Sequence, residues 1–325
     1  MDPKNISHAA AEALKKAAYD PKKLALLHTG AAMLLSFAIS LINFLITKSM
    51  DATTGLAQMG SRAVLGTVQS VLSMAGTFAL PFWEVGFLYA VLRNLRFSDA
   101  RPADLTEGFR RFGAVARLYI LIFAIAMLLF YLCMQVATIL ISLTPFWETM
   151  LQDAKALMDN AAAAGQTALS PNDMLALLPS MLPVLVVIGI LLIVIGIPIF
   201  YRFRLAFFAL MDDATGARDA LRRSGRVTRG SKRKLFKLDL HFWWYYAALL
   251  VTAVIAYGDV LLPALGVTLP LSADALFFLT YGIYLVLQTL LAWQFAAHVQ
   301  TAYAVFYEEG KKAAAQQTPP QLPEA

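Results

Sequence analysis

The chain alternates between long apolar runs and shorter charged connectors. The apolar runs cover about residues 24–47, 66–92, 118–143, 182–205, 241–262 and 275–300. Each run has roughly the 20 residues with which a helix crosses about 30 Å of hydrocarbon. Because every backbone polar group must be paired inside a bilayer, such runs form helices. The pattern therefore predicts an all-α fold, a polytopic bundle of six transmembrane helices.

Lysine and arginine are distributed unevenly between the two sides of this predicted bundle. The N-terminus, the second and fourth connectors and the tail together carry 24 of these residues. The opposite side carries three, at Lys48, Arg62 and Lys155. Since Lys and Arg are concentrated in cytoplasmic loops, both termini are expected to be cytoplasmic and the protein to pass several times through the plasma membrane.

The overall composition also indicates a membrane protein and narrows its chemistry. Hydrophobic residues make up 59% of the chain and charged residues 15%, against about 25% charged residues in a soluble domain. The single cysteine, Cys133, excludes a disulfide or a cysteine metal site within one chain. The four histidines form no ligand pair at helical spacing, and no zinc-protease or nucleophile-elbow motif occurs. We therefore expect no metal, no cofactor and no enzymatic activity.

The most basic connector leads directly into the fifth apolar run. The aromatic cluster Phe242–Tyr246 lies at the start of this run, as at a membrane interface. Residues about 215–230 place small and apolar side chains on one helical face and arginines on another, which predicts an amphipathic helix in the inner headgroup plane. Because this apolar face is weak, Leu221→Ala is expected to have little effect. Flanking spans make anionic lipid a nearer partner than nucleic acid, and the expected contacts are Arg218, Arg222, Arg226, Arg229, Lys232, Arg233, Lys234 and Lys237.

Basic amphipathic interfacial helices are also predicted elsewhere on the cytoplasmic side, and a short helix is expected over Ile6–Ala18. On the opposite side of the membrane, an interfacial helix is expected over Trp147–Met158. Ser170–Asp173 has the residues of a helix start. The polar, Ala- and Pro-rich residues 310–325 are expected to be a disordered cytoplasmic tail.

One short motif occurs three times on the cytoplasmic side. It consists of an acid, a small residue, a large apolar residue and two bases, and it begins at Glu12, Glu107 and Asp219. It suggests three helical-hairpin repeats, residues 6–96, 102–212 and 215–309, within one membrane domain of residues 1–309. The alternative is that membrane-facing helices converge on such a pattern without repetition.

Glu84 is the one acidic residue deep within an apolar run. It lies nine residues from Arg93, which places it about 13 Å above the expected inner boundary, near the midplane. A carboxylate there is costly unless it is protonated, paired or hydrated. Two interpretations follow: a proton or cation site, or a structural carboxyl bonded to Gln135, Gln288 or the carbonyl that a proline frees. The predicted kink sites are Pro81 and Pro198.

The last third of the chain carries a pattern of motifs that is similar to a known family. The motifs are Ala220–Ser224 (ALRRS), Gly230–Leu240 (GSKRKLFKLDL) and Phe306–Glu308 (FYE). The early segments Ala10–Lys15 and Gly108–Phe112 look similar as well. The chain thus resembles the bacterial membrane-protein family of domain of unknown function 975. The resemblance implies a multi-span helical protein in the bacterial inner membrane, and it implies no catalytic residues.

Two functions from different classes fit these observations. The first is a non-enzymatic membrane organiser or partner subunit with anionic-lipid contacts, and it leaves open a protein partner or a homo-oligomer. The second is a transporter of small molecules or lipids that uses Glu84 and the proline-kinked helices. A continuous polar path to Glu84 distinguishes the second from the first.

Overall fold

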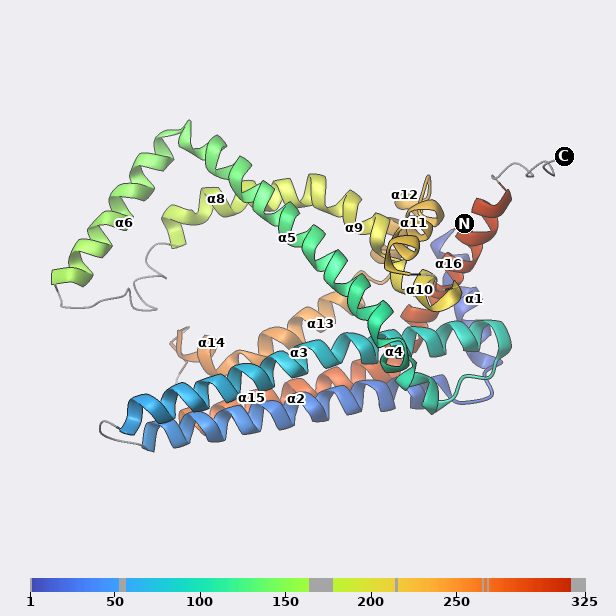
Figure 1. The fold of residues 1–325 in the computed structure, drawn as a ribbon, viewed down its shortest axis with the longest axis horizontal. Coiled ribbons are helices and arrows are strands. Elements are labelled where there is room, and N and C mark those ends of the chain that lie inside the picture. The colour runs from blue at the N-terminus through green and yellow to red at the C-terminus, as the bar shows by residue number, and fades with distance from the viewer. Residues whose placement is uncertain are drawn as a thin grey trace. The chain divides into compact units, whose positions relative to one another are not determined.

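The computed structural model describes residues 2–52, 57–163, 178–213, 216–264, 266–267 and 269–316. Within these ranges every regular element is a helix and no strand occurs, in agreement with the predicted all-α class (Figure 1). Two compact units make up the fold. Unit 1 contains residues 1–119 and 204–325, and unit 2 contains residues 120–203.

Five helices in the described residues are long and apolar enough to span a membrane. They are Pro21–Ser49, Val64–Phe97, Phe112–Ser142, Pro179–Asp212 and Ala273–Gln316. A sixth span is obtained if Lys232–His241 and Trp243–Ala256, which are bent by 60° against each other, are counted as one. The predicted multi-span bundle is therefore confirmed with five to six candidate spans.

Unit 1 has an apolar shaft of antiparallel helices (Figure 1). Helix α2 (Pro21–Ala52) packs on α3 (Ala57–Phe97) and on α15 (Ala273–Leu291), and α15 packs on α13 (Trp243–Ala256). The expected fifth span is divided, because α13 ends at Ala256 and a short α14 (Gly258–Ala264) follows. The outward faces of these helices carry large apolar side chains such as Leu34 and Val286, which are exposed.

Two polar contacts mark the ends of this shaft. At one end, Lys48 forms an ion pair with Asp274 at 2.8 Å. At the other end, the Lys22 ammonium donates a hydrogen bond of 3.2 Å to the side-chain carbonyl of Gln294. Gln294 follows Asp274 by 20 residues, which corresponds to about 30 Å of helix. The apolar length of the shaft therefore matches the hydrocarbon thickness of a bilayer.

Beyond Gln294, unit 1 continues into a packed helical region that we call the basic end. Its central helix, α16 (Ala297–Gln316), continues α15 through the π-helical segment η3 (Ala292–Ala296). Residues 301–307 of α16 are all buried. A helix that is buried on every side needs protein around it. That protein is supplied by α1 (Pro3–Lys15), α3 and α11 (Ala217–Val227), each of which packs on α16.

The remaining helices of the basic end attach to this core. Helix α10 (Ala206–Asp213) packs on α3 and α11, and α12 (Lys232–His241) packs on α1. The helix predicted near the N-terminus is confirmed by α1. Because α16 reaches Gln316, residues 310–316 of the expected disordered tail are helical instead, and Gly310 is buried. The rest of that tail lies outside the described residues.

The second connector folds back tightly on α3. It forms η1 (Pro102–Thr106) and α4 (Glu107–Arg110), and both pack on α3. A Cβ added at Gly86 of α3 would lie 1.9 Å from the carbonyl oxygen of Leu105, and one added at Gly108 would lie 1.9 Å from that of Phe82. Only glycine permits these two backbone approaches.

Unit 2 is formed by helices with long apolar stretches. It holds most of α5 (Phe112–Ser142), followed by α6 (Pro145–Ala163), which contains the predicted interfacial helix. Helix α6 packs on α8 (Leu178–Leu191), and α8 continues through the π-helical η2 (Leu192–Gly196) into α9 (Ile197–Phe203). Pro198 is the second residue of α9, directly after the π-helical turn. The helix start expected at Ser170–Asp173 lies outside the described residues.

Candidate functional site

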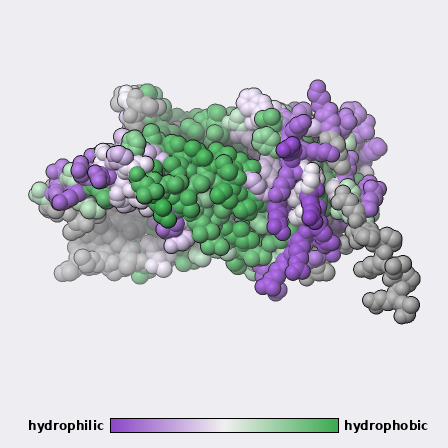
Figure 2. Space-filling view, turned by 90° about the horizontal axis from the view of Figure 1, so that it is seen from above, coloured by the Kyte–Doolittle hydropathy of each residue, from purple (hydrophilic) through white to green (hydrophobic). Residues whose placement is uncertain are grey.

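All eight basic residues predicted to contact lipid are exposed on α11, on α12 or in the turn between them. Figure 2 shows that hydrophilic side chains gather at the basic end. The eight residues do not share one environment, because the two helices that carry most of them differ in what lies beside the charges. We therefore consider α11 and α12 separately.

Helix α11 turns its apolar face into the protein. Ala220, Leu221, Ser224 and Val227 are buried, and the helix packs on α10 and α16. Val227 lies so close to Gly310 that an added Cβ there would be 2.6 Å from its Cγ1. The predicted amphipathic helix therefore forms, with the predicted faces, but its weak apolar face rests on neighbouring helices. Its small residues allow this close packing.

Helix α12 presents apolar and basic side chains on its outer surface together. Leu235 and Leu238 are buried. Phe236 is 51% exposed and Leu240 is 58% exposed, and the next helix begins with the exposed Trp243. Positions 236 and 240 share one helical stripe of α12, and Trp243 lies beyond the 60° bend that follows the helix. Arg233 and Lys237 lie beside this stripe on the helix, and Lys232 and Lys234 of the same helix are exposed as well.

A buried ionic cluster connects three helices of the basic end. Asp212 of α10, whose side chain is only 3% exposed, contacts Arg96 of α3 at 2.6 Å and Lys311 of α16 at 2.6 Å. The Tyr307 hydroxyl donates a further hydrogen bond of 2.9 Å to Asp212. Arg96 also pairs with Glu308. The charges of this cluster compensate one another, so the cluster can hold α3, α10 and α16 together.

A second polar cluster holds the junction between α12 and α13. One terminal nitrogen of Arg204 donates to the Asp239 carboxylate at 3.2 Å and to the hydroxyls of Tyr246 at 3.0 Å and Tyr303 at 3.1 Å. The two hydroxyls lie 2.6 Å apart, and Tyr303 also donates to Asp239. The cluster connects α12, α13 and α16, and it fixes the end of α12 that leads into the shaft.

A third cluster fastens the second connector to α3. Arg93 pairs with Asp99 at 2.9 Å and with Asp104 at 2.8 Å. Arg101 also pairs with Asp99, at 3.0 Å. Hydrogen bonds from Arg101 and Arg93 lower the pKa of the Asp99 carboxyl below its ordinary value. Asp99 is therefore ionised at neutral pH and keeps both pairs.

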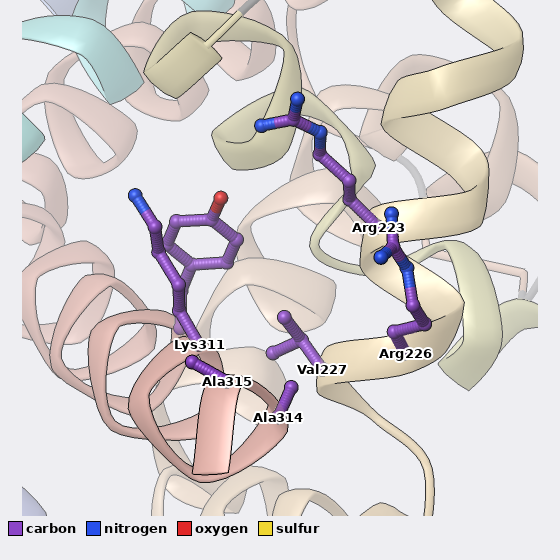
Figure 3. Close-up of a pocket in the computed structure, with 7 residues that line it drawn as sticks. Arg223, Arg226, Val227, Lys311, Ala314 and Ala315 are labelled. Carbon is purple, nitrogen blue, oxygen red and sulfur yellow. The ribbon is translucent and has the colours of Figure 1, made fainter. Parts of the chain in front are cut away.

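A pocket lies between α11 and α16 (Figure 3). Its volume is about 250 Å³, and it is lined by Arg223, Arg226, Val227, Tyr307, Lys311, Ala314 and Ala315. Arg223 is held by Asp219 at 2.7 Å and Lys311 by Asp212, whereas Arg226 forms no ion pair within the described part of the chain. A wider hollow of about 680 Å³ lies by Arg93, Arg96 and Arg111.

Glu84 contacts a histidine that the sequence analysis did not connect with it. His28 Nε2 of α2 lies 3.3 Å from Glu84 Oε2 of α3. The imidazole is stacked on Phe87, with ring centroids 4.5 Å apart, and the Trp83 indole donates to the His28 carbonyl at 2.8 Å. His28 is 8% exposed, whereas the Glu84 side chain is 46% exposed. Neither residue lines the two hollows of the basic end.

The helix pairing also changes the depth at which Glu84 is expected. Its partner His28 precedes Lys48 by 20 residues, or about 30 Å, which is the whole hydrocarbon thickness. In addition, α4 with the exposed Arg110 packs beside Phe82. This count places Glu84 near one edge of the apolar shaft, whereas the count from Arg93 placed it near the midplane. The two differ because α3 continues past Glu84 into the basic end.

The other predicted site residues are placed as follows. Gln288 lies half-buried on α15 in unit 1, and Gln135 is exposed on α5 in unit 2. Helix α3 continues through Pro81 as one element. In the described residues no group of three or more His, Cys, Asp or Glu side chains could hold a metal ion.

With five to six described helices long and apolar enough to span a bilayer, the chain has the architecture of a helical membrane protein. A family model described as "Protein of unknown function (DUF975)" matches residues 1–314. The chain belongs to this family. No curated protein matches the chain. No solved structure matches it either.

Proposed function

We propose that this membrane protein is a non-enzymatic organiser or partner subunit that holds anionic lipid headgroups against α12. The observation that carries the proposal is the outer surface of α12, where Phe236 and Leu240 are exposed among four bases. Apolar side chains beside Lys and Arg are the composition of a helix that lies in the interface of an anionic membrane.

The orientation of α12 supports the same function. Helix α12 is bent by 60° from α13, and α13 packs along the shaft. A helix bent this far from a membrane-spanning neighbour runs closer to the membrane plane than to its normal. The exposed Trp243 and Trp244 follow directly, and tryptophan is enriched at the level of the headgroups. In this proposal the basic end and both termini face the cytoplasm of a bacterial cell, as the distribution of Lys and Arg predicts.

Helix α11 has a different role in the proposal. Its Val227 touches Gly310, which follows Gln294 by 16 residues, or about 24 Å along the helix. That distance is about three times the Debye length of about 8 Å at physiological salt, so the attraction of Arg222 and Arg226 to the headgroups is largely screened. The direct headgroup contacts are therefore assigned to Arg233 and Lys237.

Spin-labelled lipids test the proposal with a matched control. The protein is reconstituted in phosphatidylcholine bilayers, and the immobilised fraction of spin-labelled phosphatidylglycerol is compared with that of spin-labelled phosphatidylcholine. A base near the surface contributes about 1 kcal/mol, so each base removed from α12 should lower the preference for phosphatidylglycerol about fivefold. The double variant Arg233→Gln with Lys237→Gln should therefore lose most of the preference for phosphatidylglycerol.

The control removes the same charge from α11. Arg218→Gln with Arg222→Gln should change the preference much less, because these residues lie farther from the headgroups. Equal losses in the two double variants, or no preference for phosphatidylglycerol in the wild type, would contradict the proposal.

Transport is the second candidate function, and one observation favours it. The His28–Glu84 contact places two ionisable groups at the edge of the apolar shaft, and such groups in membrane helices are often functional. Proton uptake into vesicles that contain a pH-sensitive dye tests this directly. Uptake that is lost in Glu84→Gln supports proton-coupled transport, and equal rates in Glu84→Gln and the wild type argue against it.

A further inference from the structure

The pocket between α11 and α16 collects cationic groups on one side. Figure 3 shows Arg223 and Arg226 extending from α11 and Lys311 rising from α16, with the pocket open between the two helices. Three of the seven residues that line it are therefore basic. The other side chains are the Tyr307 ring and the small apolar groups of Val227, Ala314 and Ala315.

Among the residues that the structure describes, the surroundings of the pocket have more positive than negative charge. Asp212 and Glu308 balance Arg96 and Lys311, and Asp219 balances Arg223. This leaves the charge of Arg226, which is exposed and unpaired within the described residues. Helix α11 as a whole carries four arginines and one acid. A ligand in the pocket therefore meets a positive electrostatic potential, which favours the binding of an anion.

The kinds of hydrogen-bond donor in the pocket narrow the chemical class of this anion further. A guanidinium offers several N–H groups in a planar fork and binds phosphate oxygens in pairs, and an ammonium adds a point charge. Two arginines and one lysine around a hollow of about 250 Å³ thus suit a tetrahedral phosphate with a small substituent. The alanines leave the opposite side free of bulky groups that would compete for this volume.

We infer that the pocket formed by α11 and α16 is a binding site for a phosphate group, with Arg226 as its principal free donor. The inference does not rest on the proposed lipid contacts of α12, which involve other residues. Lys311 follows Gln294 by 17 residues, or about 25 Å along the helix. This position suits a phosphate compound that approaches from solution. The alternative ligand with the same phosphate group is a lipid headgroup.

Thermal unfolding of the full-length protein tests the site, with inorganic phosphate as the probe. In a phosphate-free maltoside detergent, phosphate should raise the unfolding temperature above that found with chloride at equal ionic strength, since a ligand that binds only the folded state stabilises it. Arg226→Gln should weaken the apparent affinity about tenfold, the loss expected for a charge-assisted hydrogen bond. Arg222→Gln, an exposed arginine of the same helix outside the pocket, should leave it unchanged.

A second pair of variants keeps the test independent of the arginines. Ala315 lines the pocket and Ala313 does not, and both are exposed near the end of α16. Ala315→Glu should abolish the phosphate effect by placing a carboxylate at the site, whereas Ala313→Glu, with the same charge change, should retain it. Equal behaviour of the two alanine variants, or of Arg226→Gln and Arg222→Gln, would overturn the site, as would a phosphate effect no larger than that of chloride.

The source of the phosphate is distinguished in nanodiscs. If the site takes soluble phosphate compounds, the phosphate effect persists whether the discs contain phosphatidylcholine alone or phosphatidylglycerol as well. If it takes a headgroup, phosphatidylglycerol occupies the pocket and removes the effect of added phosphate in the wild type, but does not alter the unfolding temperature of Ala315→Glu. Both results support a phosphate site and assign its ligand.

Discussion

Helices α11 and α12 are neighbours in the chain and similarly basic, but they differ in where their apolar side chains lie. Leu221 and Val227 of α11 are buried against other helices, whereas Phe236 and Leu240 of α12 are exposed beside lysines and arginines. Charge alone therefore does not distinguish a helix that completes a folded core from one that, in our proposal, lies at the membrane surface. The two kinds of helix differ in whether apolar side chains are exposed next to the charged ones.

The largest effect is expected at the ionic cluster that supports both helices. Asp212→Ala leaves Arg96 and Lys311 without their shared buried carboxylate. Removing one partner of a buried pair costs about 3–5 kcal/mol, and the free energy of unfolding in detergent should fall by that amount. Glu12→Ala, at an exposed acid of α1, is the control and should change it by less than about 0.5 kcal/mol. A small effect of Asp212→Ala would mean that the cluster does not hold the basic end together.

A pair of leucines compares the two helices directly. Leu221→Ala on α11 should lower the free energy of unfolding by about 2 kcal/mol, because a buried side chain is lost. This replaces the expectation from the sequence that the substitution has little effect. Leu240→Ala on α12 should change the free energy by less than about 0.5 kcal/mol in detergent. Chemical denaturation of both variants checks this, and equal losses would remove the distinction between the helices.

The contact between α11 and α16 provides a smaller test. In Gly310→Ala the new Cβ would meet Val227 Cγ1 at 2.6 Å, and overpacking of this kind costs about 1–3 kcal/mol. Gly30→Ala on α2 is the control, because nothing lies within 4 Å of its added Cβ. Thermal unfolding should show a lower melting temperature for the first variant and an equal or higher one for the second. The reverse order would contradict the packing of α11 on α16.

The membrane helices could be predicted from the sequence because hydropathy is a local property. The run of residues 24–47 falls within α2, and the run of residues 118–143 falls within α5 except for its last residue. Each run contains enough apolar residues to identify a span without knowledge of its neighbours. The small-residue face of α11 was also visible, with Ala220 and Ser224 at helical spacing. What covers that face depends on α10 and α16, which no local pattern indicates.

The contacts between distant segments were not predictable in the same way. The His28–Glu84 contact depends on the register of α2 against α3. The signal that could have found it is the count from the connector between the two helices, since His28 lies 24 residues before Ala52 and Glu84 lies 27 residues after Ala57. The end of α16 was taken as a disordered tail because its composition is polar. Its alanines favour a helix, and Gly310 packs on α11.

Spin-label depth at two positions tests the central claim most directly. With Cys133 replaced by alanine, one label is attached at Phe236→Cys on α12 and another at Arg222→Cys on α11, in bilayers that contain phosphatidylglycerol. The label at position 236 should be relaxed more strongly by oxygen than by a water-soluble nickel chelate, because it lies among the headgroups and acyl chains. The label at position 222 should show the opposite order, because it lies in water. Greater accessibility to the nickel chelate at both positions would contradict the assignment of α12 to the membrane surface.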